Sequence, residues 1–106
     1  MLHVKKKGEK LLIRFVGELD GSSALEMERI LKEHVAKGCQ EIDIDFRYTR
    51  HFHPFGVAIA GRALAGLQRE KPRLHVYGLT KVEVQLFQTF GDMEGLDFPC
   101  FSVKPD

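Results

Sequence analysis

Histidines that could ligate a metal gather near the middle of the chain, in "RHFHPFG". His51 and His53 are two residues apart, so on an extended segment both side chains would point to the same side. His34 and His75 are the other candidate donors. A protein metal site needs at least a third ligand of suitable type, and none is spaced to join this pair. We therefore interpret these histidines as loop and capping residues, and expect neither a metal nor a cofactor.

Asp43 and Asp45 are candidates for a pair of catalytic carboxylates, because they share one face of a strand. Such acids can equally solvate an open sheet face, and we favour that interpretation. The glycines at 56, 61 and 66 recur every five residues, which matches neither a phosphate-binding loop nor a dinucleotide fingerprint and is typical of close helix packing. No catalytic constellation is complete, so we expect no catalytic residue and no enzyme activity.

Composition and charge narrow the class of protein further. Apolar residues make up 43% of the 106 residues and charged residues 29%, which are ordinary values for a globular protein, and we expect one domain over residues 1–106. A formal net charge of +1 argues against a nucleic-acid partner. The basic run at 5–7 is closely followed by Glu9, and we interpret it as a solvated strand edge.

The cysteines and the N-terminal segment indicate the cellular compartment of the protein. Cys39 and Cys100 lie 61 positions apart without a CxxC spacing, and we expect both to be reduced thiols. The segment "MLHVKKKGEK" has no apolar core of signal-peptide length, and no stretch approaches the roughly 20 apolar residues of a membrane span. These features predict a cytoplasmic protein that does not insert directly into a membrane.

Alternating apolar residues predict the strands that must position any site. In "LLIRFV" the residues on one face are Leu11, Ile13 and Phe15, and "LHV" before it is expected to form a hairpin partner. "EIDIDF" and "RLHVYG" show the same alternation. A last short strand is expected around "FPCFSV", where Pro99 favours a sheet edge.

Three segments have helical spacing. The first covers about residues 24–37: Ser23 and Glu26 have capping-box spacing, although Asp20 and Ser22 are also candidate caps, and Gly38 provides a stop. The second runs from the Pro54 region to residue 67, and the third begins at a capping box of Thr80 and Glu83 and ends at Gly91. The expected apolar stripes are Ala24, Met27, Leu31 and Val35; Val57, Ala60, Leu64 and Leu67; and Val82, Leu86 and Phe90.

The order β-β-α-β-α-β-α-β predicts an α/β fold with a mostly parallel mixed sheet of about five strands. Helices on both faces would require strands that are apolar on both sides. Arg14, Asp43, Asp45 and His75 occupy the alternate positions instead. We therefore expect the helices mainly on one face and a partly open second face.

The order of elements and several short strings resemble STAS domains, the fold of bacterial anti-sigma factor antagonists and of sulfate-transporter tails. "GELD" at 17–20 is similar to the family's G-E-L-D, and "EIDIDF" resembles its V-V-L-D-L strand, with Asp45 at the strand-end aspartate. "FHPFGVAIAGRAL" stands where the family has F-I-D-S-S-G-L, and "LHVYGL" resembles its next strand. The resemblance covers about residues 8–92.

The resemblance implies a phosphorylation switch whose chemistry this chain lacks. In antagonists of this kind a partner kinase phosphorylates the second serine of D-S-S-G, at a helix N-terminus that favours the added charge. That motif maps onto His53, Pro54, Phe55 and Gly56, so only the glycine is retained. Phenylalanine has no oxygen to accept a phosphoryl group. Phe55 is then either a core residue or a surface anchor for a partner.

We predict a non-enzymatic STAS-like regulatory module that binds a protein partner, either an anti-sigma-type serine kinase or a transporter ATPase or permease. Alternatives are a small subunit of a lipid or anion transport system and a sensor of a nucleotide or other small ligand, and a homodimer is compatible with the open face. Hydroxyls that could replace the lost phosphoacceptor are Thr49, Ser22 and Ser23, besides Tyr48. The expected partner-binding residues are Glu18, Asp20, Ser22, His53, Phe55 and Gly56.

Overall fold

The computed structural model, which describes residues 1–67, 70, 72–90 and 101–103, has a five-stranded mixed sheet at its centre. The first two strands form the predicted antiparallel hairpin, and the remaining strands run parallel to the second. The α/β fold expected from the sequence is thereby confirmed. In spatial order the strands are β1 (Leu2–Lys7), β2 (Lys10–Phe15), β4 (Glu41–Asp45), β6 (Arg73–Leu79) and β7 (Phe101–Val103).

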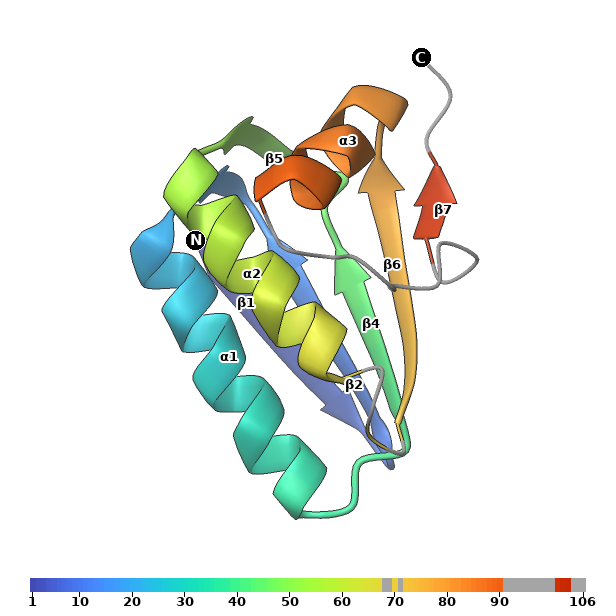
Figure 1. Cartoon of the computed structure of the whole chain (residues 1–106). Coiled ribbons are helices and arrows are strands. Elements are labelled where there is room, and N and C mark those ends of the chain that lie inside the picture. Colours follow the sequence, from blue (N-terminus) through green and yellow to red (C-terminus); the bar gives the residue numbers. More distant parts are fainter. Residues whose placement is uncertain (68–69, 71, 91–100, 104–106) are drawn as a thin grey trace.

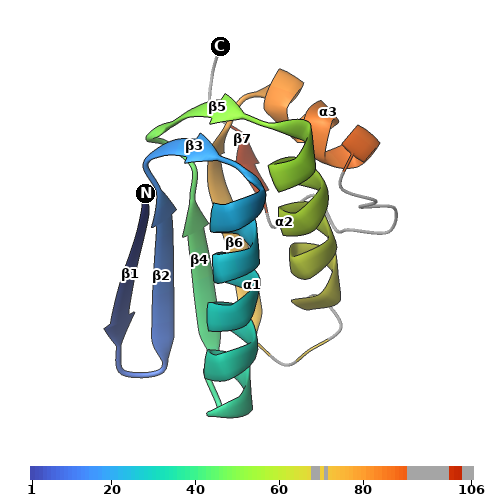
Figure 2. The same ribbon diagram turned by 90° about the vertical axis from the view of Figure 1, so that its left-hand side faces the viewer.

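The long helices α1 (Gly21–Ala36) and α2 (Pro54–Leu67) lie side by side on one face of this sheet (Figure 1). The third helix, α3 (Lys81–Phe90), packs near the end of the sheet where β6 finishes. Turned by 90°, the molecule shows these helices on one side of the strands, and no helix of the described part of the chain covers the other sheet face (Figure 2). The core fills the space between the two layers, with fully buried Leu11, Ile13, Met27, Ile44 and Leu64 among its members.

A second, two-stranded sheet was not predicted. It pairs β3 (Gly17–Leu19) with β5 (Thr49–Phe52) in parallel, beyond the ends of β2 and β4 (Figure 2). Strands of three and four residues carry too few alternations for a pattern to show, which is why the sequence indicated only loops here. This small sheet brings the "GELD" segment next to "RHFHPFG".

The start of α1 differs from the predicted Ser23–Glu26 capping box. The helix begins at Gly21 with Asp20 as its N-cap. The Ser23 backbone N–H donates to the Asp20 carboxylate at 2.9 Å, and the Asp20 N–H donates to the Ser23 hydroxyl at 3.0 Å. Ser23 is therefore the distal partner of a box that starts three residues earlier, and Glu26 is exposed. An acidic N-cap accepts the orphan N–H strongly, which explains the earlier start.

The stripe of α3 also lies on another face than predicted. Its Thr80–Glu83 capping box is present, with hydrogen bonds of 2.9 and 3.2 Å, but Val82 is 64% exposed. Val84 and Phe87 are buried instead, and the Phe87 ring lies 5.5 Å from that of Phe46. Packing of Phe87 against Phe46 places this second apolar stripe in the core. The predicted stop at Gly91, Pro99 and Cys100 lie outside the described residues.

Candidate functional site

The N-terminus of α2 is built against the end of β3. Pro54 is the first helical residue, where its missing N–H leaves no partner unsatisfied. The His53 N–H donates to the Leu19 carbonyl at 3.0 Å, and the His53 carbonyl accepts from the Val57 N–H at 2.9 Å. The first of these hydrogen bonds joins the segment before α2 to the end of β3, and the second closes the first turn of α2.

Gly56 is required by the closeness of this contact. A Cβ at position 56 would lie 2.4 Å from the Leu19 carbonyl oxygen and 2.8 Å from the Asp20 carbonyl carbon, and both neighbours are backbone atoms. No side chain can rotate away to relieve such an overlap. Gly56 thus positions the site rather than contacting a partner through a side chain.

Phe55 lies on the surface, with 77% of the residue exposed. This placement excludes the core role, and the role of Phe55 as a surface anchor stays a prediction. The ring edge reaches Gly21 at the start of α1, where its Cδ1 would be 3.8 Å from an added Cβ. Leu25, one turn further along α1, is 52% exposed as well. An apolar surface therefore extends from the start of α2 onto the first turns of α1.

Polar residues border this apolar surface on the β3 side. His53 Nε2 lies 3.3 Å from the Glu18 carboxylate, and both side chains are about half exposed. Asp20 is only partly accessible, because its carboxylate caps α1. Hydrogen bonds from the backbone and hydroxyl of Ser23 hold the pKa of Asp20 below its ordinary value, so it is ionised at neutral pH.

The candidate phosphoacceptors have different surroundings. Ser22 is exposed in the first turn of α1. The Ser23 hydroxyl is engaged in the capping box, and the Thr49 hydroxyl donates to the Phe15 carbonyl at 3.0 Å. Tyr48, the residue directly before β5, is 49% exposed. Ser22 and Tyr48 are thus the more accessible hydroxyls of this group.

The histidines do not form a ligand set. The rings of His51 and His53 lie 6.4 Å apart, centroid to centroid, and both residues are exposed. His34 Nδ1 contacts the Ile30 carbonyl at 2.9 Å on α1, and His75 stacks on Tyr77 in β6. Within the described part of the chain, no three histidine, cysteine or acidic side chains are grouped as metal ligands.

Asp45 is fully buried, which the alternation in "EIDIDF" did not indicate. Its carboxylate accepts hydrogen bonds from Arg14 Nε at 2.9 Å and from the Arg47 backbone, Nε and Nη2 at 2.9 to 3.1 Å. Burial alone would raise the pKa of Asp45, but the hydrogen bonds from Arg47 and Arg14 outweigh it and hold the pKa below its ordinary value. Asp43 pairs instead with Lys10 at 3.1 Å, so the two acids act separately.

The arginine cluster around Asp45 was missed by sequence analysis. The Arg14 guanidinium lies 4.9 Å from the Tyr48 ring centre, and that of Arg47 lies 5.1 Å from the Tyr77 ring centre. Gly78, at φ +92°, allows the Arg47 backbone to approach β6, since a Cβ there would lie 2.4 Å from the Arg47 nitrogen. One signal in the sequence could have indicated this cluster: Arg14 and Asp45 lie opposite each other when β2 is paired with β4.

This arrangement of sheet, helices and α2 N-terminus is the STAS fold, and solved anti-sigma factor antagonists share it. The phosphorylated form of the Bacillus cell fate determinant SpoIIAA is 17% identical, with a TM-score of 0.73 over 100% of this chain and 93% of that one. A serine-to-glutamate variant of RsbS from Moorella thermoacetica is 13% identical, with a TM-score of 0.72 over 98% and 87%. An antagonist from Mycobacterium paratuberculosis is 18% identical, with a TM-score of 0.67 over 100% and 86%.

The sequence itself matches no family model and no curated protein. In the described residues no helix is both long and apolar enough to cross a membrane.

Proposed function

We propose that residues 1–106 act as one STAS-like, non-enzymatic regulatory domain that binds a protein partner. The docking surface comprises the start of α2, the end of β3 and the first turn of α1, with Glu18, Asp20, Ser22, His53 and Phe55 at the surface and buried Gly56 positioning it. The observation that carries the proposal is the 77% exposure of Phe55 on a helix start that is fixed to the rest of the fold. The solved structures that resemble this chain include proteins described as anti-sigma factor antagonists.

The physical case rests on what an exposed phenylalanine can contribute. Large aromatic side chains at the centre of an interface supply much of the binding free energy, and a polar rim around them excludes water. Leu25 extends the apolar area beside Phe55, and Glu18 with His53 provides a rim. Since the backbone beneath is hydrogen-bonded and sterically fixed, little ordering free energy is lost on binding.

Binding at this surface is proposed to be independent of phosphorylation at position 55. SpoIIAA has been solved in unphosphorylated and phosphorylated forms, and the resemblance places its kind of phosphoacceptor at Phe55. A phenyl ring cannot be phosphorylated. The expected partner is an anti-sigma-type serine kinase, to which this domain would present a permanently uncharged aromatic contact.

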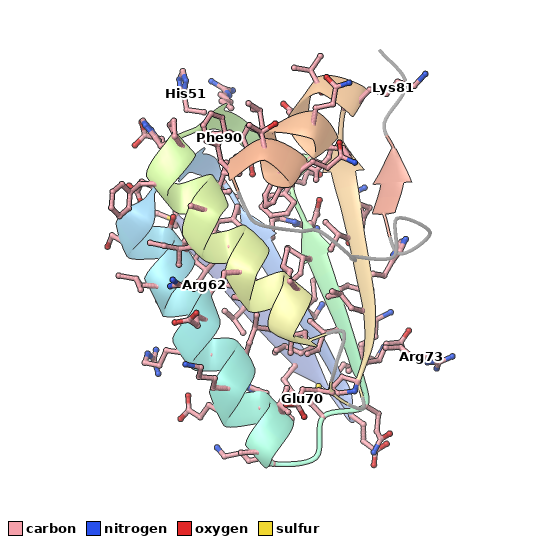
Figure 3. The ribbon with its side chains drawn as sticks, viewed as in Figure 1. His51, Arg62, Glu70, Arg73, Lys81 and Phe90 are labelled. Atoms are coloured by element: carbon pink, nitrogen blue, oxygen red, sulfur yellow. The ribbon has the colours of Figure 1, made fainter. Side chains whose placement is uncertain are left out.

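Pull-down of the tagged protein from its native cell extract tests the proposal, with retained proteins identified by mass spectrometry. Phe55→Glu places a charge at the centre of the surface and should abolish retention of the kinase. Val82→Glu makes the same kind of change at an exposed apolar position on α3 and should leave retention unchanged. Figure 3 marks the neighbouring Lys81 on the other side of the view from His51 on β5.

The two variants separate the outcomes. Equal retention of the kinase by wild type and Phe55→Glu would refute the docking surface. Recovery of a transporter ATPase or permease in place of a kinase would refute the antagonist role and favour the transport-subunit alternative. Thermal unfolding of both variants must match wild type, because both positions are exposed.

A further inference from the structure

A second surface feature lies just beyond the ends of β2 and β4, where the chain leaves these two strands. A depression of about 430 Å³ is lined by Val16, Gly17, Arg47, Tyr48 and Arg50. The two strands are adjacent and parallel, so the depression lies outside their carboxyl ends. In open α/β sheets this is the edge at which small ligands bind.

The charge of the depression is positive. Arg47 and Arg50 both line it, and no acidic side chain does so in the described part of the chain. Asp45 lies behind it, fully buried, and is shared by Arg14 and Arg47. Two arginines thus share one carboxylate, and Arg50 is a third cation at the depression. Within the described residues Arg50 has no ion pair, so its guanidinium is available to a ligand.

Arg47 is oriented before any ligand arrives. Its Nε and Nη2 are held by Asp45 at 3.1 Å each, and its guanidinium packs over the Tyr77 and Tyr48 rings at 5.1 and 5.6 Å. These contacts use one edge of the guanidinium and leave Nη1 for a further acceptor. A side chain fixed in this way loses little rotamer freedom on binding.

We propose that this depression binds the phosphate group of a small organic phosphate monoester. Guanidinium groups match phosphate oxygens through paired N–H donors. A phosphate monoester carries nearly two negative charges at pH 7, which suits two arginines better than the single charge of a carboxylate. The phosphate would fill only part of the depression, so the organic part of the ligand would lie against Val16 and the half-exposed Tyr48.

The test is an NMR titration of the amide signals with phenyl phosphate and with inorganic phosphate, at a constant ionic strength of about 150 mM. Saturable shifts are expected at Gly17 and Arg47, and phenyl phosphate should bind more tightly than inorganic phosphate. Arg50→Ala should weaken binding of phenyl phosphate by about tenfold, since it removes one charged hydrogen-bond donor. Arg62→Ala is the matched control, because Arg62 lies in the middle of α2 (Figure 3).

Three results would overturn the proposal: shifts that do not saturate, equal affinity of Arg50→Ala and Arg62→Ala for phenyl phosphate, or equal affinity of wild type for the two phosphates. The inference does not rest on the docking surface. Phe55→Glu should bind phenyl phosphate as wild type does, so either proposal can fail alone.

Discussion

Phe55 and Gly56 are neighbours in sequence with opposite demands on their side chains. Phe55 is exposed, and its substitution should affect binding rather than folding. Gly56 touches backbone on the β3 to α1 turn, so any Cβ must push two elements apart. The residue that a partner would contact and the residue that positions it are therefore distinct.

Gly56→Ala is expected to lower the free energy of unfolding by about 3 kcal/mol or more, because overpacking against backbone cannot relax by rotation of a side chain. Gly66→Ala, later in the same helix, should instead raise it by about 0.5 to 1 kcal/mol, since a Cβ there meets no atom within 4 Å and alanine favours the helix. Urea denaturation measures both. Similar effects of the two substitutions would contradict the close contact at Leu19.

At the scale of elements, Asp45 joins three segments: its own strand β4, Arg14 on β2 and Arg47 on the connection to β5. Asp45→Asn removes the charge that two arginines share. We expect a loss of about 3 kcal/mol in the free energy of unfolding at pH 7. Asp43→Asn, which affects a pair with the half-exposed Lys10, should cost clearly less in the same urea denaturation experiment. Equal losses would mean that burial of Asp45 has no energetic consequence.

The pH dependence follows from the lowered pKa of Asp45. Because the folded pKa lies below the unfolded value of about 3.9, the stabilisation is fully present above that pH and is lost as the pH falls through the folded pKa. Wild-type stability should thus fall more steeply below about pH 4 than that of Asp45→Asn. Parallel acid-unfolding curves for the two proteins would show that Asp45 does not contribute.

How far the sequence predicts these elements depends on the strength of each pattern. The main strands and α2 follow from long alternations and helical spacing, and the structure confirms them. The apolar stripe predicted for α3 is wrong because that helix has two overlapping apolar faces. Only tertiary packing of Phe87 against Phe46 selects one of them. The exposure of Phe55 and the ion cluster at Asp45 depend on contacts between distant segments, which a single sequence does not reveal.

For the whole molecule, the sheet order predicts where structure opens first. β4 lies between β2 and β6, whereas β1 forms an edge with exposed side chains along most of its length. Amides of Ile42 and Ile44 should exchange with solvent only on global unfolding, and those of β1 should exchange by local opening. Native-state hydrogen exchange checks this. Equal protection of β1 and β4 would contradict it.

The separate roles of positions 55 and 56 also affect how such a protein could change the partner that it recognises. Gly56 fixes the backbone, and the side chain at 55 projects outward without packing into the core. Many residue types should therefore be tolerated at position 55 with one unchanged scaffold. A library randomised at that single codon would be a short route to variants that recognise different proteins, whereas the adjacent codon would tolerate almost no change.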